Sequence, residues 1–591
     1  MIEPVPFRIS SRLLVFLFLC LYALLAPAQN KTESLANLAY QQGLTALKQG
    51  DLKAAHAAFN RALKLAPDSA EAHNSLGWVM GEQGQTAEAI AQLKTAVRLK
   101  PDFLHARINL ANALIKVHDF EAAEVEAKAA TELDPKSAES HRTLGRVLSL
   151  RGDLKSATAE LKQAVELEPK RAELHDEFGA LLALGSQNEE AATQFDKALT
   201  LQPNLVEAKF HLGVIRWQQK RLDDALDLLR NASQLAPRSA PSHYYLARVF
   251  EDRGQVGEAT RELQAAVHLQ PDWIEAESQL GLLLQHHGDA EGAITAFRRV
   301  TELQPDNPDA HNNLGLALLQ AGQASESMQE FEAALRLRPD DAGYRTNLGT
   351  AYLQKTDFDS AVAQFQTALK ITPQDATLHY DLGLALKLKD QLGQAVEELR
   401  KAEALDPSQP DVHYTLGVTL WQQGQFDEAV KELRAAIAAR PDYAEAYYSL
   451  GSVLKQQGQL QDAAAALREA IRIQPDFGGA HTTLAAVLRA LGDSDAAASE
   501  ARAGQRIQKE TTGLQAAALA TSSGRRLLNA GELDGAIEQF RSAITSSPNF
   551  APAHYQLAMA LERKGEKEES ASEFRKAAEL DSRLAPPPSA R

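Results

Sequence analysis

Apolar residues in this chain recur at helical spacing inside a unit of 34 residues, and the unit repeats along most of the sequence. Small residues hold three positions of the unit, with glycine or alanine at position 8 and mostly alanine at positions 20 and 27. Position 24 is a large apolar residue in many units, such as Phe59, Leu93, Phe195, Phe297, Phe331, Phe365 and Leu433. This spacing predicts two amphipathic helices per unit. The small side chains would let the two helix backbones approach to about 8–9 Å.

Proline and glycine predict where these helices end. Proline stands at position 32 of thirteen consecutive units: Pro67, Pro101, Pro135, Pro169, Pro203, Pro237, Pro271, Pro305, Pro339, Pro373, Pro407, Pro441 and Pro475. Proline stops the second helix because it lacks a backbone donor and clashes with the preceding turn. Glycine is frequent at position 15, as at Gly50 and Gly84, where it would close the first helix in the left-handed conformation. The chain is therefore predicted to be a stack of helix–turn–helix units, an arrangement that usually presents a long binding surface.

The pattern resembles the tetratricopeptide repeat family, which has a small residue at position 8, alanine at 20, a bulky apolar residue at 24, alanine at 27 and proline at 32. The resemblance covers most of the chain and implies an all-α, right-handed superhelical solenoid of about sixteen helix-turn-helix repeats. One departure is consistent, because position 4 is often a large aromatic residue in the family and is mostly histidine here. The histidines are His73, His141, His175, His243, His311, His379, His413 and His481. We expect them to pack between the paired helices.

The beginning of the chain resembles a secretory signal. Arg8 and Arg12 precede an apolar run at 13–25, and Ala26-Pro27-Ala28 forms a small-x-small cleavage site. A membrane-spanning helix needs about 20 apolar residues, and this run is shorter. We expect cleavage after Ala28, a periplasmic or secreted protein, and no membrane span in the mature chain. The alternative is a chain anchored in the membrane by an uncleaved signal.

Interruptions of the period suggest the domain boundaries. Unit 14, Gly478–Thr511, has Lys509 in place of the proline, and about five extra residues then shift the phase. The last repeat has a polar second helix, as a terminal repeat needs for solubility. The tail is rich in proline, cannot continue a helix and is expected to be disordered. The predicted segments are a signal peptide at 1–28, a linker at 29–35, repeats 1–14 at 36–511, an insertion at 512–516, repeats 15–16 at 517–584 and the tail at 585–591.

Charge and motif content narrow the function classes. The net charge is −16, from 78 acidic and 62 basic residues. This balance argues against general nucleic-acid binding, whose affinity comes largely from neutralising phosphates. The sequence has no glycine-rich phosphate loop, nucleophile elbow or paired zinc-ligand motif, and the position-4 histidines of neighbouring units would stand about 8–10 Å apart, too far to share an ion. We therefore expect no enzymatic activity, cofactor or metal, and a protein or peptide partner.

The candidate binding residues come from the first helices. In the family, positions 2, 5, 9 and 12 of this helix line the concave surface. Here positions 5 and 12 of four successive units carry a set that we call the aromatic–basic strip: Tyr380, Lys387, Tyr414, Trp421, Tyr448, Lys455 and Arg489. The alternative is that the tyrosines pack on neighbouring helices and the cations are solvated. Arg142 and Arg146 of the fourth unit are the next candidates.

Two functions are compatible with these observations. The first is a non-enzymatic scaffold that presents a concave groove to an extended peptide or a partner domain. The second is an accessory or assembly component of an envelope export machine, such as one for polysaccharide secretion. The family's carboxylate clamp has lysine at position 5, and no unit here has that lysine. Capture of a chain end by that clamp is therefore not expected.

Overall fold

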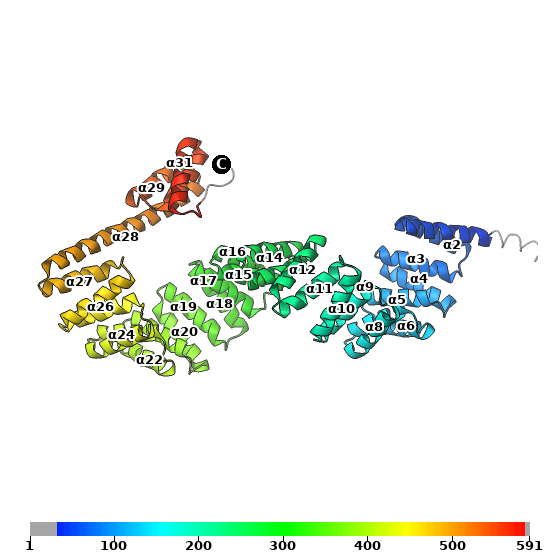
Figure 1. The fold of residues 1–591 in the computed structure, drawn as a ribbon, viewed down its shortest axis with the longest axis horizontal. Helices are drawn as coiled ribbons and strands as arrows, with labels where there is room; N and C mark the ends of the chain where they lie inside the picture. Colours follow the sequence, from blue (N-terminus) through cyan, green and yellow to red (C-terminus); the bar gives the residue numbers. More distant parts are fainter. Residues whose placement is uncertain (1–31, 585–591) are drawn as a thin grey trace, which may run out of the picture. The chain divides into compact units, whose positions relative to one another are not determined.

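The structure, a computed structural model, describes residues 32–584, which are helical apart from short turns and contain no strand (Figure 1). The expected signal peptide and tail lie outside the described residues, and 32–35 of the expected linker already belong to a helix at 32–48. No helix within 32–584 is both long and apolar enough to cross a membrane. The chain divides into two units, residues 1–296 and 297–591, and each is described by itself.

Within residues 32–584, both units consist of helices that follow one another with short turns between them. After the helix at 32–48, unit 1 contains α2 (Leu52–Leu65), α3 (Ala70–Glu82), α4 (Thr86–Leu99), α5 (Leu104–Lys116), α6 (Phe120–Leu133), α7 (Ala138–Leu150), α8 (Leu154–Leu167), α9 (Ala172–Leu184), α10 (Asn188–Leu201), α11 (Val206–Gln218), α12 (Leu222–Leu235), α13 (Ala240–Asp252), α14 (Val256–Leu269) and α15 (Ile274–His286). The division between the units falls within α16 (Ala290–Leu303). Unit 2 continues with α17 (Pro308–Gln320), α18 (Ala324–Leu337), α19 (Ala342–Gln354), α20 (Phe358–Ile371), α21 (Ala376–Leu388), α22 (Leu392–Leu405), α23 (Pro410–Gln422), α24 (Phe426–Ala439), α25 (Ala444–Gln456), α26 (Leu460–Ile473), α27 (Gly478–Ala490), α28 (Ser494–Asn529), α29 (Leu533–Ser546), α30 (Ala551–Lys564) and α31 (Lys567–Leu580).

The turn inside each helix pair has one residue in the left-handed conformation, always at position 15. Glycine takes this position in eleven turns, as at Gly322 with φ +76°. The other five turns use residues with a Cβ atom: His118, Ser186, Lys220, Thr356 and Asp390, with φ between 59° and 63°. The prediction that position 15 closes the first helix in this conformation is therefore confirmed at sixteen turns, five of them without glycine.

Close contact between positions 8 and 24 joins the two helices of a pair. A Cβ atom at Gly315 would lie 2.5 Å from a ring carbon of Phe331, so only glycine leaves room for this phenylalanine without a shift. Repeat 3 reaches the same packing differently, with alanine at both positions, Ala111 and Ala127, and both are fully buried. The small and large positions seen in the sequence are thus complementary shapes in the core.

The position-4 histidines bridge three segments through hydrogen bonds. In repeat 11, His379 Nδ1 lies 2.6 Å from Glu398 of the second helix, and Nε2 lies 3.2 Å from the carbonyl oxygen of Pro373, which ends the preceding repeat. The same bridge to a glutamate or glutamine and to a proline carbonyl is made by His73, His141, His175, His243, His311, His413, His481 and His554. The histidines lie between the paired helices, as expected, but they join the segments through hydrogen bonds that were not predicted from the sequence.

One helix departs from the two-helix unit. α28 is 36 residues long and joins the second helix of repeat 14 to the first helix of repeat 15. The expected insertion at 512–516 lies in its middle and is helical. None of residues 508–516 is buried. Since Lys509 replaces the proline that ends other second helices, nothing at this point stops the helix.

Candidate functional site

Three clefts follow one another along the first helices of unit 1. Cleft A has a volume of about 260 Å³ and is lined mainly by Trp78, Glu82, Asn109, Asn112, Ile115, Lys116 and Arg146. Cleft B has a volume of about 440 Å³ and is lined mainly by Arg142, Arg146, Ser149, Leu150, Glu177, Ala180 and Leu184. Cleft C has a volume of about 350 Å³ and is lined mainly by Ala180, Ala183, Leu184, Phe210, Val214, Gln218 and Tyr245. Because Arg146 belongs to clefts A and B, and Leu184 to clefts B and C, they form one surface across α3 to α13 that we call the first-helix groove.

Small residues hollow this groove. Position 12 is Gly81 on α3, Ser149 on α7 and Ala183 on α9, and each of them lines a cleft. Larger apolar side chains stand between the hollows and stay exposed, since Leu150 and Leu184 retain 51% and 63% of their accessible surface. Exposed leucines beside a hollow favour association with an apolar partner group, because burying a leucine side chain contributes roughly 1.5–3 kcal/mol.

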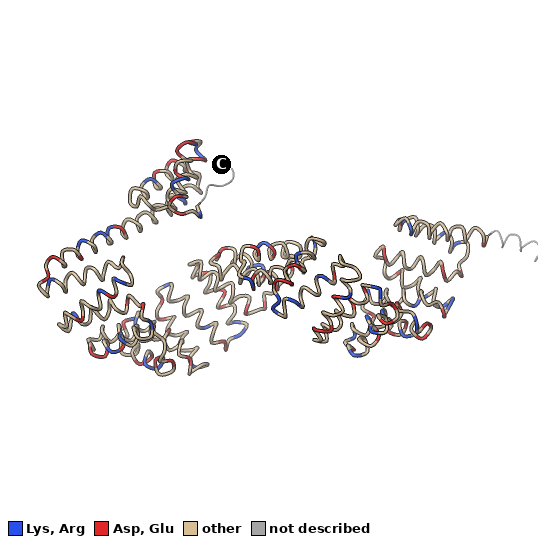
Figure 2. The backbone as a smooth tube through the Cα atoms, in the orientation of Figure 1, with Lys and Arg blue, Asp and Glu red and all other residues tan. Residues whose placement is uncertain are grey.

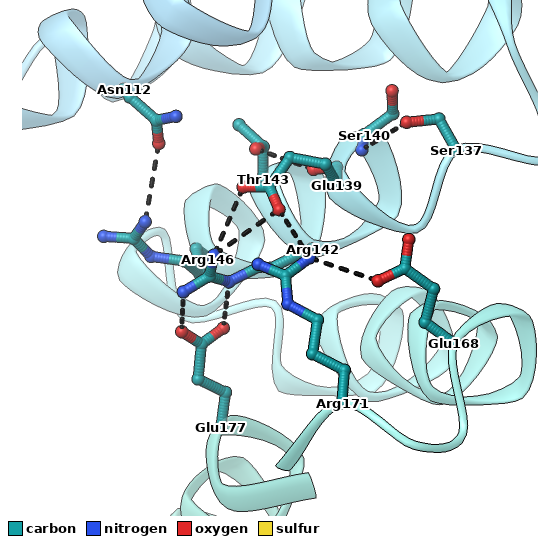
Figure 3. A network of polar contacts seen from close by, with 10 residues as sticks. All are labelled: Asn112, Ser137, Glu139, Ser140, Arg142, Thr143, Arg146, Glu168, Arg171 and Glu177. Atoms are coloured by element: carbon teal, nitrogen blue, oxygen red, sulfur yellow. Dashed lines mark hydrogen bonds and ion pairs between the residues drawn. The ribbon is translucent and has the colours of Figure 1, made fainter. Parts of the chain in front are cut away.

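Arg142 is held in place by carboxylates on both sides, as Figure 3 shows. Its Nε donates to Glu177 on α9 over 2.8 Å, its Nη2 donates to the other oxygen of the same carboxylate, and its Nη1 donates to Glu139 over 3.2 Å. Arg171 pairs with Glu139 as well, at 2.9 Å. The hydrogen bonds to Glu177 outweigh the opposing effect of burial and raise the pKa of Arg142. The charge of Arg142 is therefore balanced inside the protein.

Arg146, one turn further along α7, has a different environment (Figure 3). It is exposed, and its Nη1 donates only a long hydrogen bond of 3.4 Å to Asn112 on α5. Within residues 32–584 no carboxylate oxygen lies within 4 Å of its guanidinium group. Both arginines were secondary candidates in the sequence, and the structure separates them into one paired and one available cation.

Unit 1 also contains an aromatic group that is not among the candidates predicted from the sequence. The ring of Tyr245 lies 5.7 Å, between centroids, from Phe210 and also from Trp217. The guanidinium of Arg248 lies 5.3 Å from the Trp217 ring centroid and donates to the hydroxyl of Tyr244. Phe210 and Tyr244 occupy position 5 and Trp217 occupies position 12, so the rule that selected the aromatic–basic strip would also have found this group.

The aromatic members of the strip gather on one hydrophobic cluster of unit 2. Tyr380, Tyr414, Trp421 and Tyr448 are all half-buried and pack against residues of α22 to α28. Tyr414 also packs against Tyr443, with ring centroids 4.9 Å apart, and Trp421 Nε1 donates to Gln456 over 2.7 Å. The tyrosines therefore pack on the core of unit 2 and also keep part of their surface exposed to solvent.

The basic members of the strip are less uniform. Lys455 and Arg489 are exposed, whereas Lys387 is half-buried and burial lowers its pKa. None of the three forms an ion pair with a residue of 32–584. Beside them on α21, burial and then the charge of Asp375 raise the pKa of Asp381 to about 6.

Among the residues that the structure describes, one group of side chains has ligand atoms close enough to hold a metal ion. Atoms of Glu403, His413 and Glu432 lie within 4.8 Å of one another. However, His413 already bonds through both ring nitrogens, to Glu432 at 2.9 Å and to the Pro407 carbonyl at 3.1 Å. Burial opposes protonation of this imidazole, but its partners outweigh burial and raise its pKa. The arrangement is the histidine bridge of the other repeats with one additional carboxylate, so the donors fit an ion pair better than a metal.

Acidic and basic residues are both spread along the helices of the two units (Figure 2). Models of a known repeat family match several segments between residues 40 and 585. One tetratricopeptide repeat model matches residues 40–103, 180–240, 278–342, 414–476 and 522–585, which is more than half of the chain. The chain belongs to the tetratricopeptide repeat family. Further models of this repeat match residues 81–147, 216–280, 351–390, 385–424 and 478–503. As a tetratricopeptide repeat protein it is a protein–protein interaction scaffold, which confirms the broad class predicted from the sequence.

Several solved structures are similar to the chain, whereas no curated protein sequence matches it significantly. One chain of the APC/C hetero-tetramer Cut9–Hcn1 matches at 16% identity over 89% of this chain and 96% of that chain, with a TM-score of 0.33. MamA matches at 27% identity over 28% of this chain and 96% of its own, with a TM-score of 0.27. YrrB, described as a TPR protein with an unusual peptide-binding site, matches at 25% identity over 31% of this chain and 95% of its own, with a TM-score of 0.28.

Proposed function

We propose that this protein is a non-enzymatic scaffold that binds an extended peptide segment of a partner in the first-helix groove. The observation that carries the proposal is the continuity of clefts A, B and C, which share lining residues across successive first helices. Helices of adjacent repeats pack about 8–10 Å apart, and an extended chain spans this distance in about three residues. A peptide of about nine residues would therefore contact all three clefts.

The aromatic–basic strip is proposed as a second contact surface, on unit 2. Trp421 and the two exposed cations offer the residue types that dominate interface energetics, and aromatic and arginine truncations at such sites cost on the order of 2 kcal/mol or more. Tyr380, Tyr414 and Trp421 are poor test positions because all three pack on the core. Lys455→Ala and Arg489→Ala are better suited to test this surface, because both side chains are exposed.

A selection of displayed peptides on the purified full chain, followed by anisotropy measurements, tests the groove. The variant Leu184→Ser removes an exposed leucine shared by clefts B and C. Its matched control is Leu235→Ser, which removes a leucine that is 46% exposed at the end of a second helix. We expect the selected peptides to bind Leu184→Ser at least about tenfold more weakly and Leu235→Ser unchanged. Equal binding by both variants would reject the groove, and loss of binding only in Arg489→Ala would assign the binding site to the strip.

We also propose that the mature protein is exported and begins at Gln29. The support is the Ala26-Pro27-Ala28 site behind a short apolar run, which lies outside the described residues. N-terminal mass spectrometry of the protein from its native host checks this. A soluble cytoplasmic pool that retains Met1 would contradict it.

A further inference from the structure

Arg146 is the charged side chain of clefts A and B that lacks an internal counter-charge. In cleft A, Lys116 Nζ forms an ion pair with Glu82 Oε1 over 3.6 Å. In cleft B, both carboxylate oxygens of Glu177 accept hydrogen bonds from Arg142. Since Glu177 is engaged in this way, it does not neutralise Arg146 although both line the same cleft. The shared wall of the two clefts therefore carries one exposed positive charge that is free for a partner.

Apolar surface flanks this charge on both sides. Cleft A contributes Trp78, which is 42% exposed, and Ile115. Cleft B contributes Leu150 and Leu184. A matching ligand places an anionic group at the shared wall and an apolar side chain in each cleft. With about three residues of extended peptide per repeat, the apolar side chains stand about three residues before and after the anionic group.

We propose that Arg146 binds a carboxylate of the peptide that occupies the first-helix groove, with apolar residues about three positions to either side. This inference rests on the proposed groove function and adds the chemistry of the partner. A guanidinium suits this role because its planar fork donates two parallel hydrogen bonds to a carboxylate. Because apolar residues lie on both sides of it, the carboxylate is that of an aspartate or glutamate side chain and not that of a chain end.

The probes are fluorescein-labelled peptides in a glycine–serine background. The first has leucine three residues before and after a central glutamate and an amidated end. The second has glutamine in place of the glutamate. The third ends at the central position with a free carboxylate. Each is titrated by fluorescence anisotropy into the full chain, into Arg146→Gln and into the matched control Arg238→Gln, which changes an exposed arginine outside the clefts. Thermal melts of the variants check the fold, and we expect them to be unchanged because both arginines are exposed.

We expect the parent chain to bind the glutamate peptide at least about tenfold more tightly than the glutamine peptide. Arg146→Gln should erase this preference and Arg238→Gln should keep it. Tighter binding of the third peptide than of the first would assign the carboxylate to a chain end and overturn the proposed side chain. Equal binding of the first two peptides by the parent, or a preference that survives in Arg146→Gln, overturns the inference. If Leu184→Ser lowers the affinity for all peptides while Arg146→Gln changes none of the affinities, the groove proposal is supported and the carboxylate inference is rejected. If the parent chain binds no peptide, or if neither Leu184→Ser nor Arg146→Gln changes the affinity, the groove proposal is rejected as well.

Discussion

At the scale of single residues, position 15 shows how much one backbone conformation constrains the choice of amino acid. Every turn needs a positive φ there, and the eleven glycines that adopt it have no atom within 4 Å of the place where a Cβ would stand. Lack of space for a side chain therefore does not explain the preference for glycine at position 15. A residue with a Cβ is strained in this conformation, by roughly 1–2 kcal/mol. Five repeats therefore contain an avoidable strain in the turn between their helices.

Replacing the β-branched Thr356 by glycine should relieve this strain. We expect Thr356→Gly to raise the free energy of opening of repeat 10 by about 1 kcal/mol. The loss of the hydroxyl hydrogen bond to the Lys355 carbonyl is a small opposing effect, because that group is exposed. Native-state hydrogen exchange of α19 and α20 measures the change. The reverse substitution Gly322→Ala, in the preceding repeat, should lower protection by a similar amount, and a stabilising Gly322→Ala would refute the explanation.

Asp381 should make unit 2 less stable as the pH rises. Its folded pKa of about 6 lies above the about 3.9 of an unfolded aspartate, so folding favours the protonated carboxyl. The cost of ionising it in the folded state is absent below about pH 4 and complete above about pH 6. Asp381→Asn should therefore stabilise repeat 11 at pH 7.5, by on the order of 1 kcal/mol, and have little effect at pH 4.

Exchange rates of α21 and α22 at the two pH values measure this difference. Asp340→Asn, which changes an exposed aspartate in a loop, is the control and should be neutral at both. A stabilisation by Asp381→Asn of equal size at both pH values would show that ionisation is not its cause.

At the scale of elements, most of the fold could be predicted because its determinants are local and recur 34 residues apart. The proline, the glycine at position 15 and the pairing of small with large residues each act within one repeat. α28 could not be predicted in the same way, because Lys509 and the phase shift after it break the period without showing that the helix continues into the next repeat. The groove was harder still. Arg142 and Arg146 look alike in sequence, and only the neighbouring helices show that one is paired and the other is not.

The middle of α28 should be the weakest joint of unit 2. Residues 508–516 contribute no buried side chain, so their helix is supported mainly by its own hydrogen bonds. We expect their amides to exchange faster than those of the helices between 315 and 451, which pack on both neighbours. Hydrogen exchange with mass spectrometry resolves these segments. Equal protection along the whole array would contradict the expectation, as would slower exchange at 508–516.

At the scale of the whole molecule, the chain has a series of local cores instead of one. The large buried residue of each repeat packs mainly within its own repeat and against its neighbours, as Phe195 does in unit 1 and Phe365 in unit 2. In such an array stability is approximately a sum of repeat and nearest-neighbour terms. A partner bound to one groove segment would then stabilise that segment and leave distant repeats unchanged.

Core truncations in the two units test this description. Phe195→Ala and Phe365→Ala each remove a fully buried ring, which typically costs about 3–5 kcal/mol. If stability is additive, each variant should accelerate exchange in its own repeat and the adjacent ones and leave the other unit at its parental rates. The two variants serve as each other's control, because each disturbs a unit that the other leaves intact. Faster exchange throughout both units in either variant would mean that the array opens as one cooperative structure. In that case a ligand in the first-helix groove would also stabilise the strip on unit 2, so the same measurement decides whether the two proposed surfaces are independent.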